Sequence, residues 1–123
     1  MPHIYLEYSD NIQNLDTKPI LKAINQSMLD GQYVSAAEDL KTRAVQQSDY
    51  LIGLGDAKEA YLHAKVALLS GRDEATKVAI SQTILNAIQK TFSQPKELNV
   101  QICVEIIEMP KSSYSKVNLA AES

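Results

Sequence analysis

Alternation of apolar and polar residues predicts four β-strands along the chain. The clearest is 98–106, where every second residue is apolar and the residues between them are polar or small, which is the period of a pleated strand. A second clear segment is 60–69, and shorter ones cover 1–9 and 40–46. Pro110 follows the last segment and is expected to close it.

Two segments between these strands have the spacing of amphipathic helices. The first, about 18–30, follows Asp16-Thr17-Lys18-Pro19, a favourable helix start, and precedes Gly31, a residue type that commonly ends helices. The second follows the turn Ser70-Gly71-Arg72-Asp73 and ends before Pro95. Its apolar stripe is expected to consist of Val78, Ile84, Leu85, Ile88 and Phe92.

The order strand, helix, strand therefore occurs twice in 1–123, which we interpret as a single domain of the α+β (α/β) class. Each helix joins two strands, so each strand pair should be parallel, with both helices on one face of a four-stranded mixed sheet. Between the halves, 47–59 contains the turn formers Gly53, Gly55 and Asp56 and is expected to be a loop.

The face of the sheet away from the helices should also carry apolar or mixed side chains. Those assigned to it are Tyr5, Val45, Tyr61, Cys103 and Ile107. A sheet face exposed to water would normally be more polar, so this pattern predicts burial against other subunits.

Composition excludes several classes of protein. The chain has 12 Lys and Arg against 15 Asp and Glu, a net charge of −3, which gives no general attraction to nucleic acid or to an anionic membrane. The single cysteine, Cys103, is typical of a reducing compartment. Without a long apolar run or a secretion signal, we expect a cytoplasmic protein that does not span a membrane.

A metal site is not expected. His3 and His63 are the only histidines, and neither has an obvious carboxylate partner at ligand spacing. Cys103 is interpreted as a packed strand residue. Glu7 and Glu105 are interpreted as edge or interface charges rather than catalytic carboxylates.

Pro2 is the first candidate for chemistry. Cells usually remove an initiator methionine when the next residue is small, which would leave Pro2 with a free secondary amine. An unperturbed α-amino group titrates at about 7.7 to 8.0, and burial beside positive charge lowers its pKa, so that it can serve as a base near neutral pH. The alternative is that Pro2 simply opens an edge strand, where its missing N–H is tolerated.

The second set of candidates is cationic. Lys41 and Arg43 are two residues apart, so on a strand both side chains project to one side, while Arg72 lies in a turn at a strand end. Arginine binds a carboxylate through two parallel hydrogen bonds. Arg43 and Arg72 converging near Pro2 would hold an acidic substrate and lower the pKa of the amine; the alternative for each is a solvated surface charge.

Three segments resemble the 5-carboxymethyl-2-hydroxymuconate isomerase family of the tautomerase superfamily. They are the opening Met-Pro-His-Ile-Tyr-Leu-Glu-Tyr-Ser-Asp-Asn-Ile, Leu40-Lys41-Thr42-Arg43-Ala44-Val45, and Ser70-Gly71-Arg72-Asp73. The resemblance covers Pro2 through the fourth strand. It implies a homotrimer in which Pro2 is the catalytic base and Arg43 and Arg72 grip substrate carboxylates, without a cofactor. Lys41 stands where some relatives have arginine, which implies a role in substrate binding.

The resemblance implies enol-keto tautomerisation of 5-carboxymethyl-2-hydroxymuconate or a similar unsaturated 2-hydroxy acid, in the breakdown of homoprotocatechuate-type aromatic acids. Two other functions remain open. The order of strands and helices is also that of ferredoxin-like domains that bind small ligands without catalysis. A hydratase or dehalogenase of the same superfamily would use Pro2 as a general acid, and would need a carboxylate near Pro2 to activate water.

Overall fold

The structure is a computed structural model that describes residues 1–55 and 57–122. Strands and helices follow one another in the order that the sequence predicts, with boundaries that differ by up to three residues from the expected ones. In chain order the elements are β1 (His3–Ser9), α1 (Thr17–Asp30), the 3-10 turn η1 (Ala37–Asp39), β2 (Lys41–Gln47), β3 (Glu59–Leu69), α2 (Glu74–Thr91), β4 (Asn99–Met109) and the 3-10 turn η2 (Lys111–Ser113).

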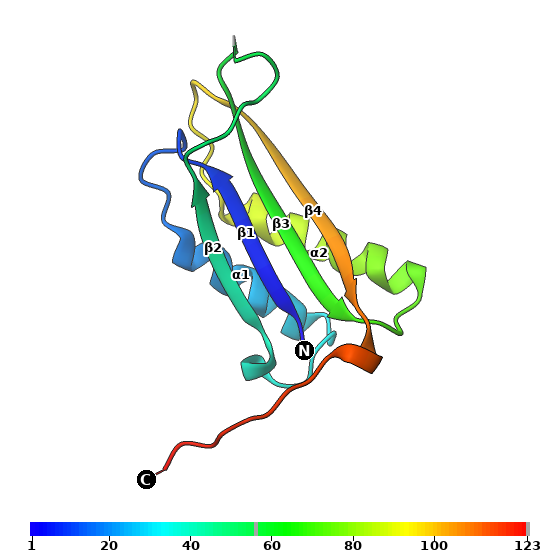
Figure 1. Cartoon of the computed structure of the whole chain (residues 1–123). Coiled ribbons are helices and arrows are strands. Elements are labelled where there is room, and N and C mark those ends of the chain that lie inside the picture. The colour runs from blue at the N-terminus through cyan, green and yellow to red at the C-terminus, as the bar shows by residue number, and fades with distance from the viewer. Residues whose placement is uncertain (56, 123) are drawn as a thin grey trace.

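The sheet has the order β2-β1-β3-β4. β1 is parallel to β2, β3 is parallel to β4, and the two halves meet through the antiparallel pair β1 and β3. Both helices lie behind the sheet in Figure 1, and the other face is turned to the viewer. The prediction of two β-α-β units with both helices on one face of a mixed sheet is confirmed.

The core lies between the sheet and the helices. It is built from inward-facing strand residues such as Leu6 and Leu62, each completely buried. α2 contributes Ile80, Ile84 and Ile88, which lie on one side of the helix at intervals of four. The expected stripe was therefore partly wrong, because Val78 is 48% exposed on the flank of α2.

The two helices begin and end differently. At α2 the carboxylate of Asp73 accepts a hydrogen bond from the backbone N–H of Thr76 at 2.8 Å, whereas Asp16 makes no such bond at α1. Gly31 does end α1, but with φ of −77° rather than a left-handed conformation. A Cβ atom at this position would collide with the ring of Tyr33, so a larger residue would require that ring to move.

The connection between β2 and β3 contains neither helix nor strand in its described residues, as expected. Within it, the ring of Tyr50 packs edge-on against Tyr61, with ring centroids 6.1 Å apart. Asp56, which the sequence analysis counts among the turn formers, lies outside the described residues.

The face of the sheet away from the helices is open in the single chain and carries exposed apolar side chains. Tyr5, Val45 and Ile107 are 36%, 42% and 40% exposed.

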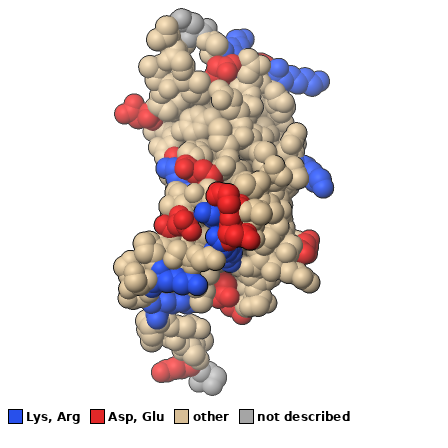
Figure 2. Space-filling model, turned by 90° about the vertical axis from the view of Figure 1, so that its right-hand side faces the viewer, with Lys and Arg blue, Asp and Glu red and all other residues tan. Residues whose placement is uncertain are grey.

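Figure 2 shows the side of the molecule that lies on the right in Figure 1, where positive and negative groups are interspersed within a largely uncharged surface. Neither helix in the described part of the chain is long and apolar enough to cross a bilayer.

Candidate active site at the head of the first strand

The candidate site lies at the end of the sheet where β1 begins. Pro2 directly precedes β1 and is buried, and its carbonyl oxygen accepts a hydrogen bond of 3.2 Å from the backbone N–H of Lys41. The parallel pairing of β1 with β2 places His3 opposite Lys41. In Figure 1 the beginnings of β1 and β2 and the ends of β3 and β4 come together at this end.

Burial and nearby cations lower the pKa of the amino terminus, which in this structure is the amine of Met1. Burial is the largest cause. Asp39 acts in the opposite direction, and three positive side chains lower the pKa further: Lys41, Arg72 and Lys116. The nitrogen of Pro2 is an amide in this structure because Met1 precedes it, and Pro2 is more deeply buried than Met1. The amino terminus therefore occupies a partly buried position among several cations.

Arg72 comes to this position through the turn between β3 and α2. Gly71 has φ of +122°, and a Cβ atom there would lie 2.9 Å from Nζ of Lys111, so the turn needs glycine. Nη2 of Arg72 donates a hydrogen bond of 3.2 Å to the carbonyl oxygen of Tyr33. A guanidinium has five N–H donors, so the remaining ones can bind an anion.

Lys41 adds a second cation at the start of β2. Its ammonium group donates a hydrogen bond of 2.7 Å to the carbonyl oxygen of Asp39. Burial, followed by the positive charge of Lys116, lowers the pKa of Lys41 below its usual value. Cations crowded in this way provide a positive potential where a carboxylate would be stabilised.

Arg43 lies one step further along β2, on the open face of the sheet. Its guanidinium carbon lies 4.3 Å from the centroid of the Tyr5 ring, and Nη2 is 2.8 Å from Nδ1 of His3. Its charge acts on His3 together with those of Lys41 and Lys116. The predicted residues are thus brought to one end of the sheet, with Arg72 and Lys41 around the terminus and Arg43 connected to it through His3.

Sequence analysis missed the C-terminal segment, which crosses this end of the sheet. Nζ of Lys116 lies 3.7 Å from Oδ1 of Asp39 and 3.0 Å from Sδ of Met1, and the hydroxyl of Tyr114 is 2.9 Å from Nε2 of His3. Here a cavity of about 400 Å³ is lined by His3, Glu38, Asp39, Lys41, Tyr114, Lys116, Val117 and Asn118. No periodic pattern after Pro110 indicated this placement.

The remaining candidates form pairs on the open face. Nε2 of His63 lies 2.6 Å from Oε1 of Glu105, a carboxylate partner that sequence spacing did not indicate because the two residues come from adjacent strands. Lys65 binds Glu7 at 3.0 Å, and Cys103 is exposed. Within residues 1–55 and 57–122, no three His, Cys, Asp or Glu side chains gather as a metal-binding group.

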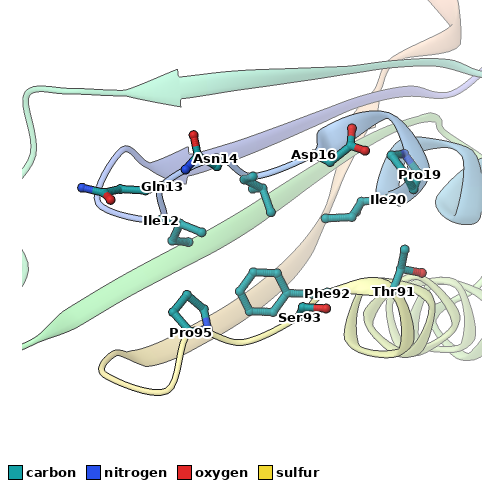
Figure 3. A pocket seen from close by; sticks show the side chains of 11 residues that line it. Ile12, Gln13, Asn14, Asp16, Pro19, Ile20, Thr91, Phe92, Ser93 and Pro95 are labelled. Atoms are coloured by element: carbon teal, nitrogen blue, oxygen red, sulfur yellow. The ribbon is translucent and has the colours of Figure 1, made fainter.

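A second cavity, of about 260 Å³ and shown in Figure 3, is lined by residues that follow the end of β1, whereas the candidate site lies at the beginning of that strand. It is bounded by the segment after β1, which includes Ile12 and Asp16, and by Phe92 and Pro95 at the end of α2. Its lining contains one acidic residue and no cation. It lacks the positive groups that an anionic ligand requires, so the candidate site remains at the head of β1.

Known structures share this fold along nearly the whole chain. A 5-carboxymethyl-2-hydroxymuconate isomerase from Deinococcus radiodurans R1 is 22% identical, with a TM-score of 0.86 over 96% of this chain and 90% of that one. A 5-carboxymethyl-2-hydroxymuconate delta-isomerase is 19% identical, with a TM-score of 0.80 over 100% and 96%. A structure described as a fused 4-OT wild type symmetric trimer is 15% identical, with a TM-score of 0.72 over 94% and 92%.

Sequence comparison is more specific than the shared fold. Curated protein sequences gave no match. The profile of the 5-carboxymethyl-2-hydroxymuconate isomerase family matches residues 2–122, which include Pro2 and all four candidate-site cations. Because this match spans nearly the whole chain, the protein belongs to the 5-carboxymethyl-2-hydroxymuconate isomerase family.

Proposed function

We propose that this isomerase acts on 5-carboxymethyl-2-hydroxymuconate or a similar unsaturated 2-hydroxy acid, with the Pro2 amine as general base after removal of Met1. The observation that carries the proposal is the position of the amino terminus, partly buried among Lys41, Arg72 and Lys116, where its pKa is lowered. An amine that is neutral near pH 7 can accept a proton. Removal of Met1 would place the amine at Pro2, which is buried.

In this scheme the Pro2 amine takes the proton of the 2-hydroxyl group and a proton is returned to C5. The double bonds shift, and the product is the conjugated 2-oxo isomer with the same atoms as the substrate. Negative charge develops on the dienolate between the two proton transfers. Arg72, Lys41 and Arg43 would bind the carboxylates and stabilise that charge, the type of preorganised electrostatic effect that usually contributes most to catalysis.

The experiment compares the same chain with and without Met1. Intact mass identifies each form, and conversion of enol to ketone is followed by absorbance. We expect the unprocessed form to be inactive and treatment with a methionine aminopeptidase to restore turnover. Pro2→Ala, which also permits Met1 removal, should lower turnover by about 10² to 10⁴ while assembly is unchanged. Equal turnover with Met1 present would refute the base assignment.

Hydration of an unsaturated acid is a second candidate because of Asp39. Its carboxylate is close enough to the amino terminus to raise the pKa of that amine, and it could activate a water molecule while Pro2 acts as a general acid. The two reactions differ in product mass. An isomer has the mass of the substrate, whereas a hydrated product gains one water, so mass spectrometry of the product distinguishes them.

We also propose that the chain assembles as a homotrimer. The open sheet face exposes Tyr5, Val45 and Ile107, and a closed arrangement of three subunits would bury it. The neighbours described as fused 4-OT symmetric and asymmetric trimers support the number three. Light scattering tests both parts: a monomer at micromolar concentration would contradict the buried face, while a dimer or hexamer would contradict only the number.

A further inference from the structure

The imidazole of His3 connects a predicted substrate-binding cation to the C-terminal segment. Nδ1 of His3 lies 2.8 Å from Nη2 of Arg43, and Nε2 lies 2.9 Å from the hydroxyl oxygen of Tyr114. Both ring nitrogens are therefore within hydrogen-bonding distance of a named partner. The rings of His3 and Tyr114 also meet edge to face, with centroids 6.1 Å apart.

The chemistry of these groups fixes the tautomer of the ring. A guanidinium has N–H donors and no acceptor, so Nδ1 of His3 must accept the hydrogen bond from Arg43. The ring proton then lies on Nε2, where it is donated to the hydroxyl oxygen of Tyr114. Only the neutral ring with the proton on Nε2 satisfies both contacts.

Arg43 is fixed by two contacts of different kinds. Its guanidinium lies over the ring of Tyr5 at 4.3 Å, and it donates to Nδ1 of His3 at 2.8 Å. The side chain is exposed on the open face, where an unrestrained arginine would occupy many rotamers. The two contacts restrict it to one arrangement and leave most of its N–H donors free.

We propose that His3, held by Tyr114, is a positioning residue that orients Arg43 toward a carboxylate group of the substrate. The inference rests on the proposed function and deepens it by including the C-terminal segment in substrate binding. His3 itself needs no contact with the reacting atoms. A preoriented guanidinium loses less conformational freedom when a carboxylate binds. The effect of His3 should therefore appear in substrate binding, measured as KM, rather than in kcat.

This arrangement makes the orientation of Arg43 sensitive to acid. The charged or titratable groups around His3 are Lys41 and Arg43 of β2, the terminal amine, Glu38 and Asp39 of η1, and Tyr114 and Lys116 of the C-terminal segment. Burial first, and then the surrounding positive charges, lower the pKa of His3 below its usual value. The ring is thus neutral at pH 7. At acid pH its protonation turns Nδ1 into a donor, and the hydrogen bond from Arg43 is lost.

The first test is independent of catalysis. Nitrogen-15 NMR of the imidazole rings reports which nitrogen carries the proton, and the chain has only two histidines, so His63→Gln assigns the signals. We expect His3 to hold its proton on Nε2 at pH 7, and Tyr114→Phe to reduce that preference. A proton on Nδ1, or equal populations of the two tautomers, would overturn the inference.

The second test separates binding from turnover. His3→Asn keeps an acceptor near the position of Nδ1, while His3→Leu removes it; circular dichroism and intact mass establish that both variants are folded and processed. We expect His3→Leu to raise KM about tenfold with kcat within about threefold, and His3→Asn to stay within about threefold of the wild type. The wild-type KM should also rise as the pH falls through the lowered pKa of His3, and His3→Asn should lack this rise.

Equal KM values for His3→Leu and the wild type, or equal losses in both variants, would overturn the inference. Titration with succinate, a simple dicarboxylate, keeps this outcome separate from a failure of the proposed function. If the wild type has no isomerase activity, the proposed reaction fails. A weaker succinate Kd in His3→Leu alone would still establish that His3 orients Arg43 for a carboxylate, and an unchanged Kd would refute it.

Discussion

Arg72 offers the sharpest prediction, because it has two separable effects at the candidate site. Its charge lowers the pKa of the amino terminus, and its guanidinium has donors left for a carboxylate after one hydrogen bond to the carbonyl oxygen of Tyr33. Arg72→Ala removes both effects. Arg72→Lys keeps the positive charge but loses the planar, two-pronged contact.

The expected magnitude follows from the contacts. A hydrogen bond to a charged group contributes about 1.5 to 3 kcal/mol, and the lower value applies because Arg72 is only half-buried. Losing two such bonds in Arg72→Ala amounts to about 3 kcal/mol, or about 100-fold in kcat/KM. Arg72→Lys retains one point contact and should lose about tenfold.

The pH dependence distinguishes the two effects. The amine acts as a base only when neutral, so kcat/KM falls as the pH drops below its pKa. Removing a positive charge raises that pKa, so Arg72→Ala should move the acid limb of the profile to higher pH. Arg72→Lys keeps the charge and should leave the limb unmoved.

The assay is kcat/KM for the enol substrate across pH on chains shown by intact mass to lack Met1. Lys111→Ala, which removes another cation at the same end of the sheet, controls for a general loss of positive charge and should stay within about threefold. The reasoning is refuted if both Arg72 variants retain wild-type kcat/KM, or if Arg72→Lys moves the acid limb as far as Arg72→Ala does.

Three further predictions concern stability and assembly. Ile84→Ala, at a completely buried position, should lower the free energy of unfolding in urea by about 2 to 5 kcal/mol; Leu85→Ala, at its partly exposed neighbour, should cost less, and equal losses would contradict the assigned core. Val45→Asp on the open face should reduce the assembled mass in light scattering, whereas Val78→Asp on the outer flank of α2 should not; the reverse result would place the interface elsewhere. Hydrogen bonds from the first turn of α2 hold the pKa of Asp73 below its usual value. The Asp73 carboxylate therefore stabilises the fold above about pH 3.9, and this contribution disappears as the pH falls through the lowered pKa. The melting temperatures of Asp73→Ala and the wild type should converge in acid, and a difference that stays constant with pH would show that the carboxylate is not the source of the stabilisation.

The fold could be predicted because each strand and each helix has a recognisable pattern within its own segment of the sequence. Each strand alternates with a period of two, and Pro95 and Pro110 limit the last helix and strand. The error at Val78 arose because an apolar residue next to the apolar stripe of a helix can lie on the exposed flank of that helix. The angle at which α2 packs on the sheet decides which of its apolar residues are buried. Gly31 was identified as a helix end from its residue type, but its right-handed backbone conformation and the closeness of the Tyr33 ring were visible only in the structure.

The candidate site was predictable where its chemistry is unusual for its position. A proline behind the initiator methionine and an arginine in a turn at a strand end are visible in the sequence alone. The contributions of Tyr114 and Lys116 were not visible, since their partners are separated from them by 111 and 115 positions. Polar contacts between residues so far apart in the sequence produce no periodic pattern. They depend on where the C-terminal segment crosses the sheet.

The doubled β-α-β order has a consequence for how many sites one chain can have. The backbone N–H of Lys41 donates to the carbonyl oxygen of Pro2, and in the second half the N–H of Asn99 donates to that of Lys58 at 3.0 Å. Lys58 thus occupies, at the head of β3, the place that Pro2 occupies at the head of β1. Its nitrogen is an internal amide that no processing of the amino terminus can free. The two halves are alike in architecture but differ in chemistry. The chain has two strand heads of the same architecture but one amino terminus, so a substitution at the head of β3 removes no basic nitrogen.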